Sequence, residues 1–197
     1  MIAVIDVSGN NLASLANALK RLGYAFELTH SPDVIKKASH VILPGVGTAS
    51  RGMRALQEHG LVEVIKQLAQ PLLGICLGMQ LLLEHSEEGD VDCLGLIPGC
   101  IKQLNYQKGY PVPHMGWNQL QWKKDSPLQL GLNNHDSVYF VHSYALQSKT
   151  YALASCEYSE TFSAVIQKNH VYGMQFHPEK SAKTGLKLLN NFLTIEV

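Results

Sequence analysis

Short apolar runs alternate with helical patterns through the first half of the chain, and this alternation constrains the fold more than any other feature. Apolar runs bounded by turn residues predict buried strands at 2–6, 25–29, 40–45 and 71–75. Apolar residues at helical spacing predict helices at 11–23, 50–69 and 77–89, the last closed by Gly89. Strands that alternate with helices favour an α/β fold, with a mostly parallel sheet covered by helices on both faces.

The second half of the chain has a different pattern. Strand-like runs separated by short polar breaks follow one another at 116–124, 136–146, 151–158, 162–169 and 171–176. Such quick succession is typical of antiparallel strands, so we expect an antiparallel extension of the sheet. A final amphipathic helix is expected at 182–195, with Ser181 as its N-cap. We expect one domain over residues 1–197.

Composition excludes several classes of function. The formal net charge is zero, and no basic tract marks a nucleic-acid surface. No apolar run is long enough to cross a bilayer, and the opening MIAVIDVSGN lacks the features of a secretory signal. The cysteines form neither a disulfide framework nor CxxC pairs, and no group of side chains has metal-ligand spacing. We expect a reduced, cytoplasmic protein with no metal and no cofactor.

The segment Gly74-Ile75-Cys76-Leu77-Gly78 lies where an expected strand passes directly into an expected helix. Glycines two positions before and after a central nucleophile are typical of the sharp turn called a nucleophile elbow. The helix start would favour the Cys76 thiolate, and the N–H of Leu77 would face a developing oxyanion. Alternatively, the glycines serve packing alone and Cys76 is a core residue.

A thiolate nucleophile needs a partner that accepts and returns a proton. His177 and Glu179 follow the last strand-like run, and residues i and i+2 of an extended segment project to the same side. A carboxylate beside the imidazole would fix its tautomer and stabilise the imidazolium. The sequence therefore predicts a triad of Cys76, His177 and Glu179, although His-Pro-Glu alone could simply be a polar strand end.

Acyl transfer also needs a second oxyanion donor, which a loop after a neighbouring strand supplies in such folds. The segment LPGVGT at 43–48 fits this role, with the amide of Val46 or Gly47 as the donor. The competing interpretation is a dinucleotide fingerprint. It fails because the third glycine of that motif is missing here and only Gly9 is present in the first-turn segment VSGNNL.

The motifs PGVG, GICLGMQLL and QFHPEKS, in this order, resemble those of the class I, triad-type glutamine amidotransferases, and the likeness spans nearly the whole chain. The segments VPHMGWN, YFVHSY and the opening VID…NLAS further resemble glutaminase subunits of imidazole glycerol phosphate synthases. The resemblance implies a flavodoxin-like amidotransferase fold. It also implies hydrolysis of glutamine through a cysteinyl thioester, and delivery of ammonia to a (β/α)₈ cyclase or synthase subunit in a heterodimer.

Residue roles carried over from this family remain expectations that follow from the resemblance. The substrate's amino-acid end would be held by Gln80 and Glu88, and Gly47 and the backbone near Ser143 and Tyr144 would also line the substrate pocket. The surface facing the partner would include His114, Met115, Trp117, Asn118 and Lys180. The alternatives are surface positions for Gln80 and Glu88, and ordinary packing for Tyr144 and Trp117.

Two loops depart from the family pattern and leave the triad untouched. The family's D-Y-G-x-G-N opening is replaced by Asp6-Val7-Ser8-Gly9-Asn10-Asn11, and Thr48-Ala49 stands where A-F usually follows PGVG. A paralogue that serves a different synthase, for example one that amidates a sugar, therefore stays open. A cysteine hydrolase of the same fold and a catalytically idle regulatory subunit are the remaining alternatives.

Overall fold

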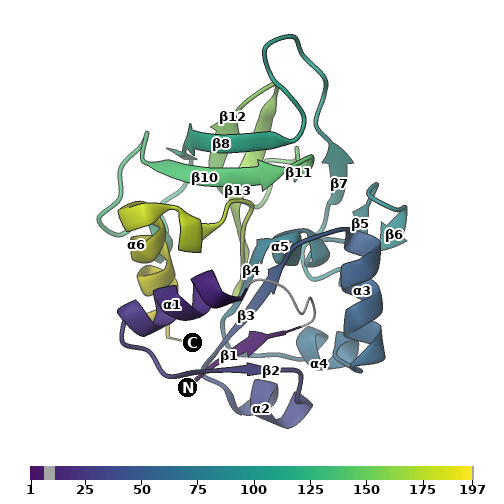
Figure 1. Cartoon of the computed structure of the whole chain (residues 1–197), viewed down its shortest axis with the longest axis vertical. Helices are drawn as coiled ribbons and strands as arrows, with labels where there is room; N and C mark the ends of the chain where they lie inside the picture. The colour runs from purple at the N-terminus through teal and green to yellow at the C-terminus, as the bar shows by residue number, and fades with distance from the viewer. Residues whose placement is uncertain (7–11, 197) are drawn as a thin grey trace.

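An eight-stranded sheet forms the centre of the computed structural model, which describes residues 1–6 and 12–196 (Figure 1). In spatial order the strands are β2 (Phe26–Thr29), β1 (Ile2–Ile5), β3 (His40–Gly45), β4 (Leu72–Cys76), β14 (Val171–Met174), β13 (Thr161–Lys168), β12 (Ala152–Glu157) and β9 (Gln121–Trp122). The first five run parallel to one another, and the last three pair antiparallel. The expected mixed sheet, mostly parallel with an antiparallel extension, is confirmed.

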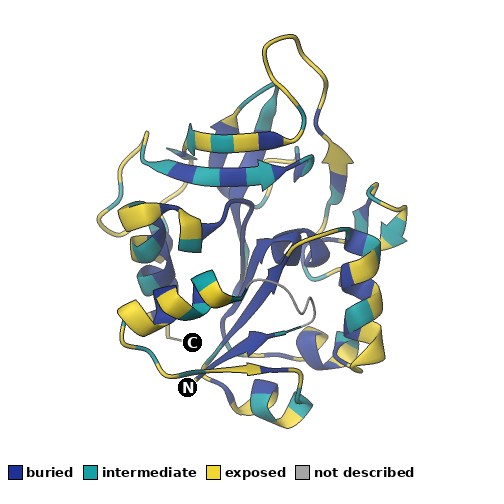
Figure 2. Cartoon of the chain, in the orientation of Figure 1, coloured by how far each residue is buried: buried dark blue, intermediate teal, exposed yellow. Residues whose placement is uncertain are grey.

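Helices cover both faces of the sheet (Figure 1). One face packs against α1 (Ala13–Arg21) and α6 (Ala182–Leu193), and the other against α2 (Pro32–Lys37), α3 (Ala49–Glu58) and α4 (Val62–Lys66). The central strands β1, β3, β4 and β14 are buried along nearly their whole length, as parallel strands covered on both sides must be (Figure 2). Burying a large side chain such as Phe192 contributes about 2 kcal/mol.

Two smaller sheets lie beyond the carboxyl end of the parallel strands (Figure 1). In one, β8 (His114–Gln119) pairs antiparallel with β10 (Ser137–His142). The other contains β11 (Tyr144–Leu146), β7 (Cys100–Gln103), β5 (His85–Ser86) and β6 (Val91–Asp92). The short 3₁₀ turns are η1 (Pro127–Gln129) and η2 (Pro178–Lys180). The strand expected at 136–146 is thus two strands, β10 and β11, which belong to different sheets.

The expected helix at 77–89 is wrong beyond its first turns. The helix α5 spans only Leu77–Leu81, and the chain then enters β5. Leu81, Leu82 and Leu83 are all buried, so this segment has no solvent face of the kind an amphipathic helix requires. The segment 50–69 also divides into two helices, α3 and α4, and α2 was not expected.

Ser181 precedes α6, but its side chain makes no capping hydrogen bond to the helix. Its hydroxyl instead accepts a hydrogen bond from Tyr139 N and donates one to the carbonyl of His177. Ser181 therefore fastens the segment carrying His177 to strand β10. Among the described residues, no helix combines the length and the apolar character that a membrane span requires.

Candidate active site

Three neighbouring parallel strands, β3, β4 and β14, end at the same edge of the sheet and deliver the expected catalytic segments to one place. A cavity of about 200 Å³ lies there. It is lined by Val46, Gly47, Cys76, Leu77, Gln80, Glu88, Val141, His142, Ser143, Tyr144, His177 and Lys180. The fold thus brings together residues that the sequence places far apart, at the strand ends where α/β proteins bind ligands.

Cys76 stands at the junction of β4 and α5 in a strained backbone conformation. Its φ is +52°, which side chains other than glycine rarely adopt. A Cβ on Gly74 would lie 2.6 Å from the carbonyl oxygen of Gly78, and one on Gly78 would collide with the carbonyl oxygen of Leu43. Both glycines are therefore required for the turn to close, as the elbow interpretation expected.

The Cys76 side chain is only 7% exposed, yet it borders the cavity. Its sulfur lies 3.7 Å from the carbonyl oxygen of Val141, to which the thiol donates, and 3.9 Å from Nε2 of Gln175, which donates to the sulfur. The sulfur is thus held between β10 and the residue that follows β14.

His177 is held firmly in the orientation that a proton carrier needs. Its Nδ1 lies 2.8 Å from Oε1 of Glu179, so Nε2 is the nitrogen left for the cavity. Burial disfavours the imidazolium, but hydrogen bonding and the charges of Cys76 and Glu179 outweigh it and raise the pKa of His177 to about 10. Within the described chain, Oε2 of Glu179 is buried without a hydrogen-bond partner.

Gln80 is buried and points inward rather than lying on a helix surface. Its Nε2 donates to the carbonyl of Tyr144 at 3.0 Å and to Oε1 of Gln175 at 3.2 Å. Both amide hydrogens are therefore used within the protein. The carbonyl oxygen of Gln80 is left as an acceptor beside the cavity.

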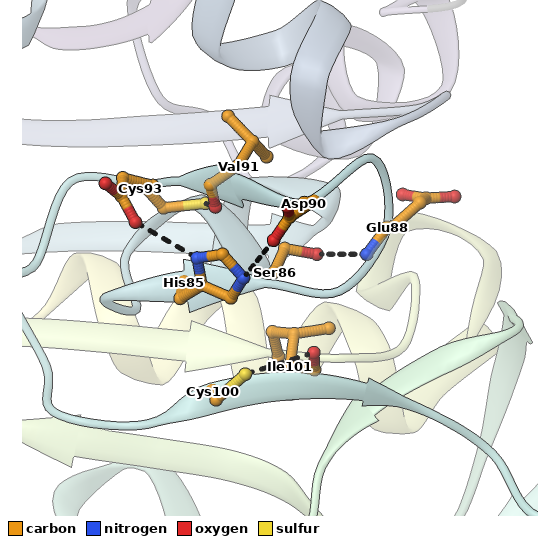
Figure 3. Close-up of polar contacts among 9 residues, drawn as sticks. His85, Ser86, Glu88, Asp90, Val91, Cys93, Cys100 and Ile101 are labelled. Carbon is orange, nitrogen blue, oxygen red and sulfur yellow. Dashed lines mark hydrogen bonds and ion pairs between the residues drawn. The ribbon is translucent and has the colours of Figure 1, made fainter.

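Glu88 lies in the turn between β5 and β6 and reaches across to α3. Its Oε2 accepts a hydrogen bond from Ala49 N, the first amide of that helix, at 3.0 Å. The turn itself is fixed by Ser86, whose hydroxyl accepts from the N–H of Glu88, and by His85, which contacts the carboxylates of Asp90 and Asp92 (Figure 3). Glu88 therefore joins the hairpin to the loop that carries Val46 and Gly47.

The loop after β3 also lines the cavity, through Val46 and Gly47. Val46 is exposed, and Gly47 has a φ of +102° that favours glycine. Thr48 makes no capping bond to α3; its hydroxyl contacts that of Ser50 at 3.3 Å. The unusual Thr48-Ala49 pair thus directly follows the cavity-lining Gly47, and Ala49 N bonds the cavity-lining Glu88. The unusual residues 7–11 lie outside the described residues.

Comparison with known proteins settles the family. Residues 3–195 match the family described as glutamine amidotransferase class-I. A Legionella pneumophila protein named imidazole glycerol phosphate synthase subunit HisH 2 is 67% identical, with 100% of this chain and 98% of the relative covered. The subunit HisH of Idiomarina loihiensis is 51% identical, covering 98% and 97%.

The chain belongs to the class I glutamine amidotransferase family. A crystal structure of a glutamine amidotransferase, 18% identical, superposes with a TM-score of 0.76 over 98% of this chain and 96% of that chain. At this identity the likeness supports the fold alone, and it agrees with the parallel strands that carry the site. The resemblance to amidotransferase motifs is therefore confirmed over the full length of the chain.

The residues expected to face a partner do not all lie at the surface of this amidotransferase. Met115 and Trp117 are 62% and 55% exposed, and Lys180 is also exposed. Asn118 is half-buried, and its amide donates to the carbonyl of Glu157. His114 is buried, stacked on Phe140 and Tyr158, so its expected place on the surface is wrong: β8 turns alternate side chains inward.

Sequence reasoning missed two residues of this site: Gln175, which contacts the Cys76 sulfur, and His142, which lines the same cavity. Gln175 stands two positions before His177 in QFHPEKS, so the alternation used to pair His177 with Glu179 would also have found it. His142 lies in YFVHSY beside the expected Ser143 and Tyr144. Among residues 1–6 and 12–196, no group of three His, Cys, Asp or Glu side chains is arranged to hold a metal.

Proposed function

We propose that this chain is the glutaminase subunit of an imidazole glycerol phosphate synthase, hydrolysing glutamine to glutamate and ammonia. The observation that carries the proposal is the strained Cys76 at the β4–α5 turn, in one cavity with His177, whose imidazole is held by Glu179. The relatives at 67% and 51% identity, named as HisH subunits, support the pathway.

The first chemical step forms a tetrahedral intermediate on Cys76. The Cys76 sulfur attacks the side-chain amide carbon of glutamine, and the thiol proton passes to Nε2 of His177. Glu179 accepts the Nδ1 proton in a hydrogen bond and stabilises the imidazolium that forms. The N–H of Leu77 and that of Val46 or Gly47 stabilise the oxyanion of the tetrahedral intermediate.

The second step releases ammonia and then glutamate. His177 returns its proton to the leaving nitrogen, the C–N bond breaks, and a glutamyl thioester remains on Cys76. Water enters, His177 removes a proton from it, and the hydroxide attacks the thioester carbon. The C–S bond then breaks, and His177 returns the proton to the sulfur, which yields glutamate and the free thiol. A pKa of about 10 keeps His177 protonated at neutral pH when the sulfur is a thiolate, which suits the acid role.

Gln80 and Glu88, which also line the cavity, are suited to bind the amino-acid end of glutamine. The free carbonyl oxygen of Gln80 and the carboxylate of Glu88 are acceptors suited to an ammonium group. Ser143 and Tyr144 border the same space and supply backbone contacts. Glutamine is therefore favoured over a peptide, whose chain would leave these acceptors unpaired.

The ammonia requires an acceptor protein, because free ammonia is protonated in water and lost as a nucleophile. We propose a heterodimer with a (β/α)₈ cyclase subunit that docks on the β8–β10 sheet, where Met115 and Trp117 are exposed. Lys180, which lines the cavity, is exposed as well. All four cysteines are free, in keeping with a cytoplasmic location.

A second candidate is a paralogous glutaminase that serves a different synthase. The observation in its favour is the Thr48-Ala49 pair, which departs from the family pattern and directly follows the cavity-lining Gly47. Recovery of the native complex and identification of the bound synthase by mass would decide between a cyclase and another acceptor. Failure to complement a strain lacking the histidine-pathway glutaminase would favour the paralogue.

Active-site labelling tests the glutaminase proposal. A diazo-ketone analogue of glutamine should attach to the Cys76 peptide, as detected by mass spectrometry, and glutamine should protect against it. Cys76→Ala should abolish both labelling and glutamine turnover. The matched control is Cys156→Ala, which removes a buried thiol outside the cavity and should leave both unchanged. Labelling that persists in Cys76→Ala would exclude this nucleophile.

A further inference from the structure

The side chain of Gln175 contacts the reacting sulfur and has no part in the triad. It is completely buried, directly after β14 and two residues before His177. Its Nε2 lies 3.9 Å from the Cys76 sulfur, and its Oε1 accepts a hydrogen bond from Gln80. This fully buried amide is therefore positioned to donate a hydrogen bond to the sulfur of Cys76.

The donating orientation of Gln175 follows from its neighbours. The carbonyl oxygen of Tyr144 can only accept, so the NH₂ group of Gln80 must face it. The other hydrogen of that NH₂ group points at Gln175, which must therefore present its oxygen there. The NH₂ group of Gln175 is then left facing the sulfur.

A pair of buried histidines fixes the far end of this chain of hydrogen bonds. Nδ1 of His142 lies 2.9 Å from the Tyr144 carbonyl and must donate to it, so its Nε2 accepts from Nδ1 of His114 at 3.1 Å. Burial lowers the pKa of His142 to about 3 and that of His114 to about 4. Both rings stay neutral at physiological pH, and each keeps one N–H in a fixed direction.

We infer that Gln175 is a further catalytic residue, whose amide N–H holds the Cys76 sulfur as a thiolate. Gln80, Tyr144 and His142 are positioning groups that keep this amide in its donating orientation. Hydrogen bonds to an ionised partner are about twice as strong as neutral ones, so the contact tightens when the thiolate forms. The inference rests on the proposed function only where it assumes that this thiolate attacks glutamine.

The test is the pH dependence of Cys76 alkylation by iodoacetamide in the full chain, measured on the Cys76 peptide by mass spectrometry. Gln175→Met keeps the size of the side chain and removes the donor, and we expect the midpoint to rise by about one pH unit. We also expect glutamine kcat to fall about tenfold with little change in KM. The other ionisable groups around the cavity, all unchanged, are His142, Tyr144, His177, Glu179, Glu88 and Lys180.

The matched control is Gln167→Met on β13, which removes a glutamine with two hydrogen bonds of its own away from the sulfur; its midpoint should not move. If Gln175→Met fails to fold, Gln80→Met carries the test, because it frees the Gln175 amide to rotate and should also raise the midpoint. A folded Gln175→Met, or in its place Gln80→Met, with the wild-type midpoint overturns the inference. Alkylation needs no glutamine, so wild-type turnover assayed in parallel separates this failure from failure of the proposed function.

Discussion

At the scale of single residues, the site depends on one strained position that its neighbours make possible. Cys76 adopts a positive φ because Gly74 and Gly78 leave room for the turning chain. The strain projects the sulfur toward His177 and the cavity instead of into the sheet. Backbone conformation and chemical role are therefore inseparable at this residue.

Replacing Gly78 should test how tightly the elbow is packed. We expect Gly78→Ala to lower the free energy of unfolding by about 3 kcal/mol, because the added Cβ collides with the Leu43 carbonyl, a backbone atom that cannot easily move. Urea unfolding measures the change. The control Gly109→Ala meets no atom and bears only the cost of its φ of +91°, about 1 kcal/mol, so equal losses in both variants would contradict the collision.

Removing the charge of Glu179 should change the pH profile of glutamine hydrolysis. The carboxylate is among the groups that raise the pKa of His177 to about 10, so Glu179→Gln should lower that pKa. The imidazolium needed to protonate the leaving nitrogen is then lost at lower pH, and the alkaline limb of kcat/KM should move to lower pH. We expect kcat to fall by about 10²–10⁴ as well.

Steady-state assays between pH 6 and 10.5 measure this shift. Glu157→Gln, which alters a carboxylate on β12 that is not among the cavity's lining residues, is the control and should keep the wild-type profile. An alkaline limb that stays in place in Glu179→Gln would show that Glu179 does not set the proton affinity of His177.

At the scale of elements, the active site is a property of strand order. β3, β4 and β14 are neighbours whose ends carry the Val46–Gly47 loop, Cys76 and His177. The periodicity of the first half was enough to predict the parallel strands, and the three motifs were enough to predict that their ends converge. Local residue types determine both the parallel strands and the motifs at their ends, so both could be predicted from the sequence alone.

The elements that could not be predicted from the sequence are those whose limits depend on tertiary packing. The run Leu81-Leu82-Leu83 continues a helical pattern, yet α5 stops at Leu81 because all three side chains are buried and the chain turns into β5. The segment 136–146 reads as one strand, although it divides at Ser143 between two sheets. His114 was expected at the partner-facing surface but is buried. Its inward direction depends on which face of β8 packs against the core, and the sequence does not show this.

Ser181 links two elements that hold the base in place, and its removal should loosen them. Its buried hydroxyl bonds Tyr139 N at 2.9 Å and the His177 carbonyl at 2.7 Å. We expect Ser181→Ala to cost about 2 kcal/mol in the free energy of unfolding, since a buried N–H loses its partner. Urea denaturation measures this. Ser39→Ala, which removes an exposed hydroxyl, should stay within about 0.5 kcal/mol, and a similar small value for Ser181→Ala would refute the link.

At the scale of the whole molecule, the exposed side of the β8–β10 sheet is the surface that we propose for docking of the synthase subunit. Met115 and Trp117 lie on the same side of β8. The ring of Trp117 packs edge-on against that of Tyr139, with 5.9 Å between the ring centroids. Exposed aromatic and methionine side chains of this kind are enriched at protein interfaces.

Truncating the tryptophan should weaken the proposed complex without harming the fold. We expect Trp117→Ala to raise the dissociation constant for the synthase subunit about 30-fold, because large aromatic side chains dominate interface energies. Isothermal titration calorimetry measures the affinity. Gln119→Ala on the same strand is the control, with an expected change below threefold. An unchanged affinity in Trp117→Ala would move the interface elsewhere.

The position of β14 between β4 and β13 has a consequence for how the enzyme is made. Gln175 lies 99 residues after Cys76 in the chain, yet the strand before it occupies the middle of the sheet. While the ribosome is still translating residues before 171, the nucleophile has already emerged but its proton carrier does not exist. Under the proposed mechanism, a nascent chain therefore cannot hydrolyse glutamine until β14 has paired with β4.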